Sequence, residues 1–315
     1  MNSFSVIIPL YNGSAYIELA IQSILRQTLL PTEILVIDDG STDDGPTLVE
    51  QQAYPLVRLI RQRNAGVSAA RNKGMTESRA DFLTFLDADD VWEKDHLEIL
   101  STLIDKYPQC GIYGTSYYLC KPGNTPTLPQ LPAPYSFSGE DGVMDNYFVL
   151  SSGINPPLHM SSFCVRKKHL QAIGGFPVGI PAGEDSITLA RLYARCEIAY
   201  SCRPTSIYYL YPMEGKKPRP SLWYTPVDAQ FDALLQEAKH RKGVRRYVSS
   251  WHKGRMAGAL LSGQYKLALR EFWIAFTLFP WQKKLYTALL AALYARHTRR
   301  SLYEINQSHR KPKNL

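Results

Sequence analysis

The sequence lacks the cysteine patterns that cross-link small secreted proteins or hold structural zinc. Its five cysteines include no Cys-x-x-Cys pair, and their odd number argues against a disulfide framework. Residues 1–9 also lack the basic segment and the long apolar run of a secretory signal. We therefore expect a cytoplasmic protein, with peripheral contact to the inner face of the cell membrane as a further hypothesis.

Two nucleotide-binding motifs are missing as well. The chain has no Gly-x-Gly-x-x-Gly and no Gly-x-x-x-x-Gly-Lys-Ser/Thr segment. Neither a dinucleotide fingerprint nor a Walker loop therefore supports a redox enzyme or an NTPase. No apolar run reaches the ~18 uninterrupted residues of a membrane-spanning helix.

Acidic residues are scarce in the C-terminal quarter. Residues 239–315 contain 17 lysines and arginines against 2 acidic residues, whereas the rest of the chain contains 19 against 26. Such asymmetry points to a polyanion facing the tail, namely anionic lipid, nucleic acid or a phosphorylated substrate. The chain has 315 residues, 45% of them apolar, which is enough for one large domain with an extension.

Short apolar runs alternate with amphipathic stretches in the first ninety-odd residues. We predict strands at residues 4–10, 33–37, 56–60 and 82–86, with helices between them. This alternation is typical of right-handed βαβ units. It indicates an α/β fold, with a mostly parallel sheet flanked by helices.

Acidic residues follow two of these strands. Asp39 comes just after residues 33–37, and Asp87 and Asp89 come just after residues 82–86. Parallel strands present their carboxyl ends at one edge of a sheet, where ligands bind, so we expect these acids to converge there. Clustered carboxylates suit a divalent cation such as Mg²⁺ or Mn²⁺. Acids that only cap the following helices are the alternative.

Four segments together resemble glycosyltransferase family 2, whose members have the GT-A fold. They cover roughly the first third of the chain, in the family's order and spacing. The segments are Val-Ile-Ile-Pro-Leu-Tyr-Asn (6–12), Ile-Leu-Val-Ile-Asp-Asp-Gly-Ser-Thr-Asp (34–43), Asn-Ala-Gly (64–66) with Ala-Arg-Asn-Lys-Gly (70–74), and Phe-Leu-Asp-Ala-Asp-Asp (85–90).

The resemblance implies a nucleoside-diphosphate sugar as the donor, expected to be UDP-linked. Pro9 and Tyr11 would frame the nucleobase, unless they form only a strand end and an ordinary turn. Asp39 would accept a hydrogen bond from the base or the ribose. Helix capping remains the alternative for Asp39.

The resemblance also implies a metal site. Asp87 would contact the sugar and the ribose, and Asp89, with Asp87 beside it, would bind Mn²⁺ or Mg²⁺. That ion would grip the diphosphate and stabilise it as the leaving group. Arg71 would either serve the phosphates or pair with Asp87 or Asp89, and the sequence leaves this choice open.

Two further candidate residues begin a later amphipathic helix. Glu184 and Asp185 lie in its first turn, where acids often only complement the helix dipole. Residues 174–176, 183–185 and 189–192 are similar to the family's acceptor-side signature, in which the Asp is the catalytic base. The resemblance implies that Asp185 takes the acceptor's proton during an inverting displacement and that Glu184 orients the substrate.

A basic segment follows the predicted strand at residues 206–210. Lys216, Lys217 and Arg219 occupy a region where relatives often carry a residue that meets the diphosphate. These side chains either neutralise the leaving group or belong to a solvated loop.

The basic tail has the pattern of helices. We predict them near residues 227–239, 247–261, 265–278 and 281–296. Their aromatic and basic side chains either lie on an anionic membrane surface or belong to an ordinary helical core with solvated charges.

We divide the chain into a GT-A domain, residues 1–224, and a basic helical C-terminal extension, residues 225–315. Residues 1–108 are expected to bind the nucleotide sugar, and residues 109–224 to form the acceptor half. We also expect a helix over residues 91–108.

The sequence predicts an inverting, metal-dependent glycosyltransferase that acts on a cell-surface glycan or a lipid-linked acceptor. A nucleotide-sugar pyrophosphorylase is the alternative, but residues 11–14 lack the Gly-rich basic loop expected of it. Nucleic acid is not an expected partner, because no helix-turn-helix, zinc or aromatic sheet motif accompanies the basic tail.

Overall fold

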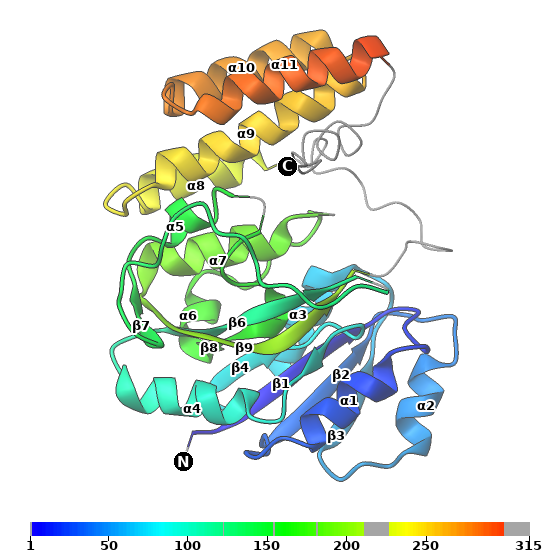
Figure 1. Cartoon of the computed structure of the whole chain (residues 1–315). Coiled ribbons are helices and arrows are strands. Elements are labelled where there is room, and N and C mark those ends of the chain that lie inside the picture. The colour runs from blue at the N-terminus through cyan, green and yellow to red at the C-terminus, as the bar shows by residue number, and fades with distance from the viewer. Residues whose placement is uncertain (1, 122, 154, 181, 211–226, 299–315) are drawn as a thin grey trace, which may run out of the picture.

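The structure is a computed structural model that describes residues 2–121, 123–153, 155–180, 182–210 and 227–298. Within these ranges, one nine-stranded sheet has the order β3-β2-β1-β4-β8-β6-β9-β5, with β7 paired to β9. Helices cover both faces of the sheet, and the C-terminal helices form a further layer on one side (Figure 1).

The first half is the predicted series of βαβ units. Its strands β1, β2, β3 and β4 pair in parallel. The apolar, often β-branched side chains of β1, β2 and β4 are buried on both faces of the sheet, as is usual for parallel strands, whereas the edge strand β3 is only half-buried. The elements are β1 (Phe4–Leu10), α1 (Ile17–Leu25), β2 (Glu33–Asp38), α2 (Gly45–Gln51), β3 (Val57–Arg61), α3 (Val67–Glu77) and β4 (Phe82–Phe85).

The second half makes the sheet mixed. Strand β8 runs antiparallel to both β4 and β6, whereas β6 and β9 are parallel. The α/β class with its flanking helices is thus confirmed, and the antiparallel pairs belong to the second half. Its elements are β5 (Val91–Trp92), α4 (His96–Lys106), β6 (Ile112–Cys120), β7 (Asp141–Met144), α5 (Tyr147–Leu150), the 3₁₀ turn η1 (Met160–Ser162), β8 (Phe163–Arg166), α6 (Lys167–Ala172), α7 (Glu184–Arg195) and β9 (Ile198–Tyr209).

Two predicted elements have different bounds. The helix expected over residues 91–108 begins at His96, because Val91 and Trp92 pair with β9 instead. The strand expected at residues 206–210 is only the end of β9, which passes through Pro204 at a break in its register with β6. Proline cannot donate to a strand ladder, so the sequence gives little sign of a strand here.

Each face of the sheet has its own apolar core. On one face, side chains of β1 and β2 pack against α1, α2 and α4, with Ile21 and Leu100 among the buried residues. On the other face, the sheet packs against α3, α6 and α7, with Ala70 and Leu192 in the core. The two helices that carry candidate site residues, α3 and α7, therefore share one face.

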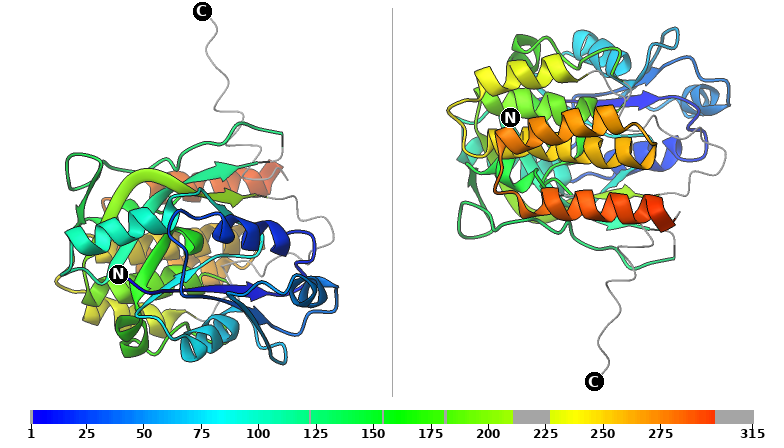
Figure 2. Two further views of the ribbon diagram at one scale, coloured as in Figure 1. Left: turned by 90° about the horizontal axis from the view of Figure 1, so that it is seen from below. Right: turned by 90° about the horizontal axis from the view of Figure 1, so that it is seen from above.

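The C-terminal helices are α8 (Asp228–Glu237), α9 (Val244–Leu261), α10 (Tyr265–Leu278) and α11 (Lys283–Thr298). Phe231 of α8 and Tyr247 of α9 join the same apolar core as α7. Helices α10 and α11 lie outside α9, away from the sheet (Figures 1 and 2). No helix in the described ranges is long and apolar enough to cross a bilayer. The domain boundary predicted at residues 224 and 225 falls outside these ranges and stays a prediction.

Candidate active site

Turns after β1 and β2 are fastened to each other at the carboxyl edge of the parallel strands. Asn12, in a left-handed conformation with φ 51°, accepts a hydrogen bond at Oδ1 from the Thr42 backbone N–H at 2.8 Å. The Ser14 N–H donates to Asp43 Oδ2, also at 2.8 Å. The two turns, which include the ends of segments 6–12 and 34–43, are therefore joined into one edge of the sheet.

Pro9 and Tyr11 lie at the mouth of β1. Pro9 is within the strand opposite Ile37, and Tyr11 follows the strand with 55% of its surface exposed. An exposed ring at this edge is accessible for stacking on a base. Their contact with a nucleobase remains a prediction.

Asp39 holds the loop that leads into α3. Its side chain is 3% exposed and accepts hydrogen bonds from Gln62 Nε2 at 2.7 Å, the Ala65 N–H at 2.9 Å and the Gly66 N–H at 2.8 Å. Gly66 has φ +90° and is the residue from which α3 starts. Asp39 therefore holds the loop just before α3, and its contact with the donor stays a prediction.

Arg71 on α3 connects two of the predicted acids. Its guanidinium, 3% exposed, donates from Nη2 to Asp87 Oδ1 at 2.7 Å and from Nη1 to Glu184 Oε1 at 3.0 Å. Burial alone would lower the pKa of Arg71, but the charges of Asp87 and Glu184 outweigh burial and raise it. Arg71 thus stays a cation, and of the acids named in the sequence prediction its partner is Asp87.

The neighbouring Asn72 ties α3 to the turn before α7. Its Nδ2 donates to the Phe176 carbonyl and its Oδ1 accepts the Phe176 N–H, both at 2.8 Å. The Phe176 ring lies under the Arg71 guanidinium, 5.4 Å from centroid to Cζ. The segments 70–74 and 174–176, both noted in the sequence, are therefore in direct contact.

The acidic turn after β4 is held from below by Ser161. Its hydroxyl accepts the Asp87 N–H at 3.1 Å and donates to Asp90 Oδ2 at 2.6 Å. Asp90 is fully buried, and burial together with the nearby Asp87 charge raises its pKa well above the ordinary value. Asp90 therefore supports the turn, whereas Asp87 and Asp89 are partly exposed beside it.

His159 lies beside the acidic turn, a position that the sequence did not reveal. Its Nδ1 lies 3.8 Å from Asp90 Oδ2, and its Nε2 lies 3.1 Å from Ser206 Oγ. Burial lowers the pKa of His159 to about 4, so the ring is neutral near neutral pH. It stands alone in an irregular segment, with no motif or periodicity around it that could have signalled a role.

Glu184 and Asp185 begin α7 after Gly183, which has φ +84°. Burial raises the pKa of Glu184, Asp185 adds to the rise, and Arg71 opposes it. Asp185 is partly exposed and accepts the Ser186 N–H at Oδ1, at 2.6 Å. Tyr247 of α9 donates to the Ser186 carbonyl at 3.1 Å, so a C-terminal helix supports this turn.

The structure thus brings Arg71, Asp87 and Glu184 into direct contact, with Asp185 close enough to raise the pKa of Arg71 further. Asp39 is linked to the group through the start of α3. Lys216, Lys217 and Arg219 lie outside the described residues, so their predicted roles stay predictions.

The acidic turn fits a hard divalent cation. One oxygen of Asp87 is engaged by Arg71, and Asp89 lies two positions away with its side chain partly exposed. Mg²⁺ is usually held by one or two carboxylates together with substrate phosphates, so this pair of acids suffices. Asp90 is too deeply buried to serve as a third ligand.

A parallel half joined to a mixed half, with helices on both faces of the sheet, is the arrangement of the GT-A fold. The crystal structure of S. aureus TarS 1-349 in complex with UDP-GlcNAc has a similar fold to this chain. The TM-score is 0.66 and the sequence identity is 18%, over 95% of this chain and 92% of the TarS chain. The family model described as "Glycosyl transferase family 2" matches residues 5–156. This match includes all four segments and confirms the resemblance to the family that they predicted.

Relatives of this chain include two bacterial proteins. It is 41% identical over 104 residues to "Uncharacterized glycosyltransferase YibD" of Escherichia coli (strain K12), covering 32% of this chain and 30% of that protein. It is 33% identical over 143 residues to "Putative teichuronic acid biosynthesis glycosyltransferase TuaG" of Bacillus subtilis (strain 168), covering 44% and 56%. The alignments thus span less than two thirds of either relative.

Proposed function

We propose that this protein is an inverting glycosyltransferase that transfers a sugar from a UDP-sugar to a hydroxyl group of a cell-surface glycan or lipid-linked acceptor. One observation carries the proposal: Arg71 holds the donor-side acid Asp87 and the acceptor-side helix start at Glu184 with one guanidinium. The UDP-GlcNAc of TarS supports a UDP-linked donor, and the name of TuaG supports an envelope polymer as the acceptor.

The donor would lie along the rim of β1, β2 and β4. Tyr11 and Pro9 would frame the base, Asp39 would meet the base or ribose, and Asp87 would contact the sugar. Asp89, with Asp87, would hold Mn²⁺ or Mg²⁺, which when bound stabilises the departing diphosphate. Arg71 keeps Asp87 oriented through a charge-assisted hydrogen bond.

Asp185 is the better candidate for the base. Glu184 is 12% exposed and its carboxylate is held by Arg71, whereas Asp185 is partly exposed at the helix start. Asp185 would take the hydroxyl proton as the acceptor oxygen bonds to the anomeric carbon and the bond to the diphosphate breaks. A single displacement of this kind inverts the anomeric configuration.

A donor screen tests the proposal. The full chain is incubated with UDP- and GDP-sugars and Mn²⁺, and nucleotide release and binding are measured. Any product is then examined by NMR for its anomeric configuration. A UDP-sugar should be bound and turned over with inversion. Retained configuration, or pyrophosphate release from a nucleoside triphosphate and a sugar 1-phosphate without transfer, would contradict the proposal.

A further inference from the structure

The outermost helices carry several exposed apolar side chains. Positions 269 and 273 of α10 lie about one turn apart, and positions 286, 290 and 293 of α11 follow helical spacing, whereas Phe276 is half-buried against α9. Trp281, between the helices, is 86% exposed and Leu290 is 66% exposed. We call this set the apolar face. Its exposed members are Leu269, Trp273, Trp281, Tyr286, Leu290 and Leu293.

The opposite sides of these two helices are already occupied. Ala268 and Ala275 of α10 are buried, and so are Leu285 and Ala292 of α11; all four belong to one apolar cluster with α9. Figures 1 and 2 show α10 and α11 as the layer farthest from the sheet. The helices that carry the apolar face therefore lie in the layer farthest from the sheet, and this face is not the one that packs on α9.

The surface around the apolar face is cationic. Lys266, Lys283 and Lys284 are all exposed, and Arg270 is exposed but paired with Asp228. The described parts of α9, α10 and α11 contain one acidic residue, Glu271, and it is fully buried. Burial lowers the pKa of Lys253, and the nearby charges of Lys284 and Arg246 lower it further, which indicates a positive potential on this side.

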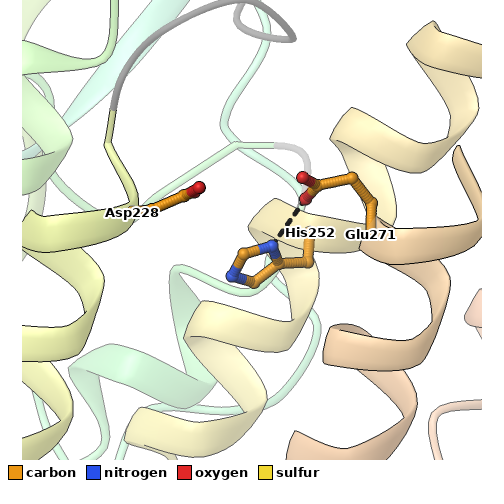
Figure 3. A group of neighbouring side chains, drawn as sticks. All are labelled: Asp228, His252 and Glu271. Carbon is orange, nitrogen blue, oxygen red and sulfur yellow. Dashed lines mark hydrogen bonds and ion pairs between the residues drawn. The ribbon is translucent and has the colours of Figure 1, made fainter. Parts of the chain in front are cut away.

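The buried acid is neutralised within the protein (Figure 3). His252 Nδ1 lies 2.6 Å from Glu271 Oε2, and Asp228 is near both. These three residue types could hold a metal ion, but a cation is already there. Arg255 is paired with Asp228 and lies 3.4 Å from Glu271 Oε1. A divalent ion would have to displace this guanidinium, so the group is better explained as a charge cluster that joins α8, α9 and α10.

We propose that the apolar face of α10 and α11 binds the surface of an anionic lipid bilayer. Exposed Trp and Leu side chains enter the headgroup region, while surrounding lysines and arginines attract anionic headgroups. A soluble polyanion would meet the same cations but gives no reason for the exposed Trp and Leu residues. A second copy of this chain would bring like charges together around the apolar face, which disfavours self-association.

Flotation of the full chain with vesicles tests this inference. Binding to phosphatidylglycerol vesicles should exceed binding to phosphatidylcholine vesicles and should weaken with salt. A Trp273→Ser and Leu290→Ser double variant and a Lys283→Gln and Lys284→Gln double variant should each bind about tenfold more weakly or worse. Leu19→Ser is the matched control, because Leu19 is 61% exposed on α1, and it should bind as the wild type does.

Several results would overturn the inference. Equal vesicle binding by both double variants and the wild type would do so, provided their circular dichroism and melting temperatures match. Binding to polyphosphate without binding to phosphatidylglycerol vesicles would identify a polyanion site. Self-association that the Trp273→Ser and Leu290→Ser variant abolishes, seen by sedimentation, would identify a second copy. Vesicle binding requires no sugar donor, so these outcomes are independent of the proposed transfer reaction.

Discussion

Arg71 Nη1 lies 3.0 Å from Glu184 Oε1, although 113 positions separate the two residues in the sequence. Arg71 is 3% exposed and Glu184 is 12% exposed, so this ion pair is largely shielded from water. The same guanidinium orients Asp87 at the tip of β4. The position of α7 and the orientation of Asp87 are therefore coupled through one side chain.

Replacing Arg71 by Met should destabilise the protein strongly. Met is similar in length but leaves Glu184 buried without its counter-charge, and breaking a buried pair in this way costs roughly 3–5 kcal/mol. Urea denaturation measures the loss. A second change, Glu184→Gln, removes the orphaned charge and should restore part of the stability. If the single variant unfolds at the wild-type urea concentration, the pair does not couple the two halves.

Gly175 should tolerate alanine much less well than its neighbour Gly174. Both glycines have φ between +75° and +79°, so alanine at either position strains the backbone by about 1–2 kcal/mol. A Cβ at Gly174 would meet open space, whereas one at Gly175 would overlap the Asn72 side-chain oxygen. Gly175→Ala should therefore also break both Asn72 hydrogen bonds to Phe176. Unfolding free energies should show a clearly larger loss for Gly175→Ala, and equal losses would contradict this reading.

Much of the parallel half could be predicted because its strands are continuous apolar runs that end in acids. The acids at positions 39, 87 and 89 follow from that pattern, and parallel pairing places their strand ends at one edge. Local sequence also placed Glu184 at a helix start. Local sequence could not show that Arg71 forms ion pairs with Asp87 and Glu184, because these contacts depend on how α7 packs beside α3.

The second half was harder to predict because its pairing is short or irregular. Strand β5 has only two residues, and β9 continues through Pro204 by shifting register. His159 and Ser161 act through tertiary contacts with Asp90, and neither has a sequence pattern that marks it. A site formed by loops from three distant segments has no periodic sequence pattern that could predict it.

Asp89→Ala should strongly weaken metal-dependent UDP binding. It removes one of the two partly exposed carboxylates of the acidic turn, and Asp87 alone has one oxygen already engaged by Arg71. Affinity for UDP with Mn²⁺ should fall by about two orders of magnitude. Calorimetry with Mn²⁺ and with EDTA measures the effect. Asp232→Ala, an exposed acid on α8, should bind UDP normally. Loss of affinity in both variants would point to a general charge effect instead.

His96 should make the fold less stable in mild acid. Its ring is fully buried against Trp92, its Nδ1 lies 2.6 Å from Thr205 Oγ1, and its Nε2 has no hydrogen-bond partner. Burial, with a smaller effect from His159, lowers the pKa of His96 from 6.5 to about 3. The unfolded chain takes up a proton below pH 6.5 that the folded chain refuses until about pH 3, so stability is complete above this window and falls through it.

The matched variant is His96→Phe, which keeps an aromatic ring beside Trp92. Between pH 6 and pH 5 the wild type should lose about 1.2 kcal/mol more unfolding free energy than this variant. Urea titrations at pH 7, 6 and 5 measure the two slopes. Parallel slopes would mean that His96 takes up a proton as readily in the folded state as in the unfolded state, so that its burial does not act as argued.

Asp185→Asn should separate donor binding from transfer. The asparagine side chain keeps an oxygen that can accept the Ser186 N–H, now 2.6 Å from Asp185 Oδ1, so the start of α7 should persist. It cannot accept the acceptor's proton, and the transfer rate should fall by about 10²–10⁴-fold while UDP-sugar affinity stays constant. Glu184→Gln is the comparison: it should lower stability through Arg71 and keep measurable turnover. Wild-type turnover by Asp185→Asn, together with an inactive but folded Glu184→Gln, would move the base to Glu184.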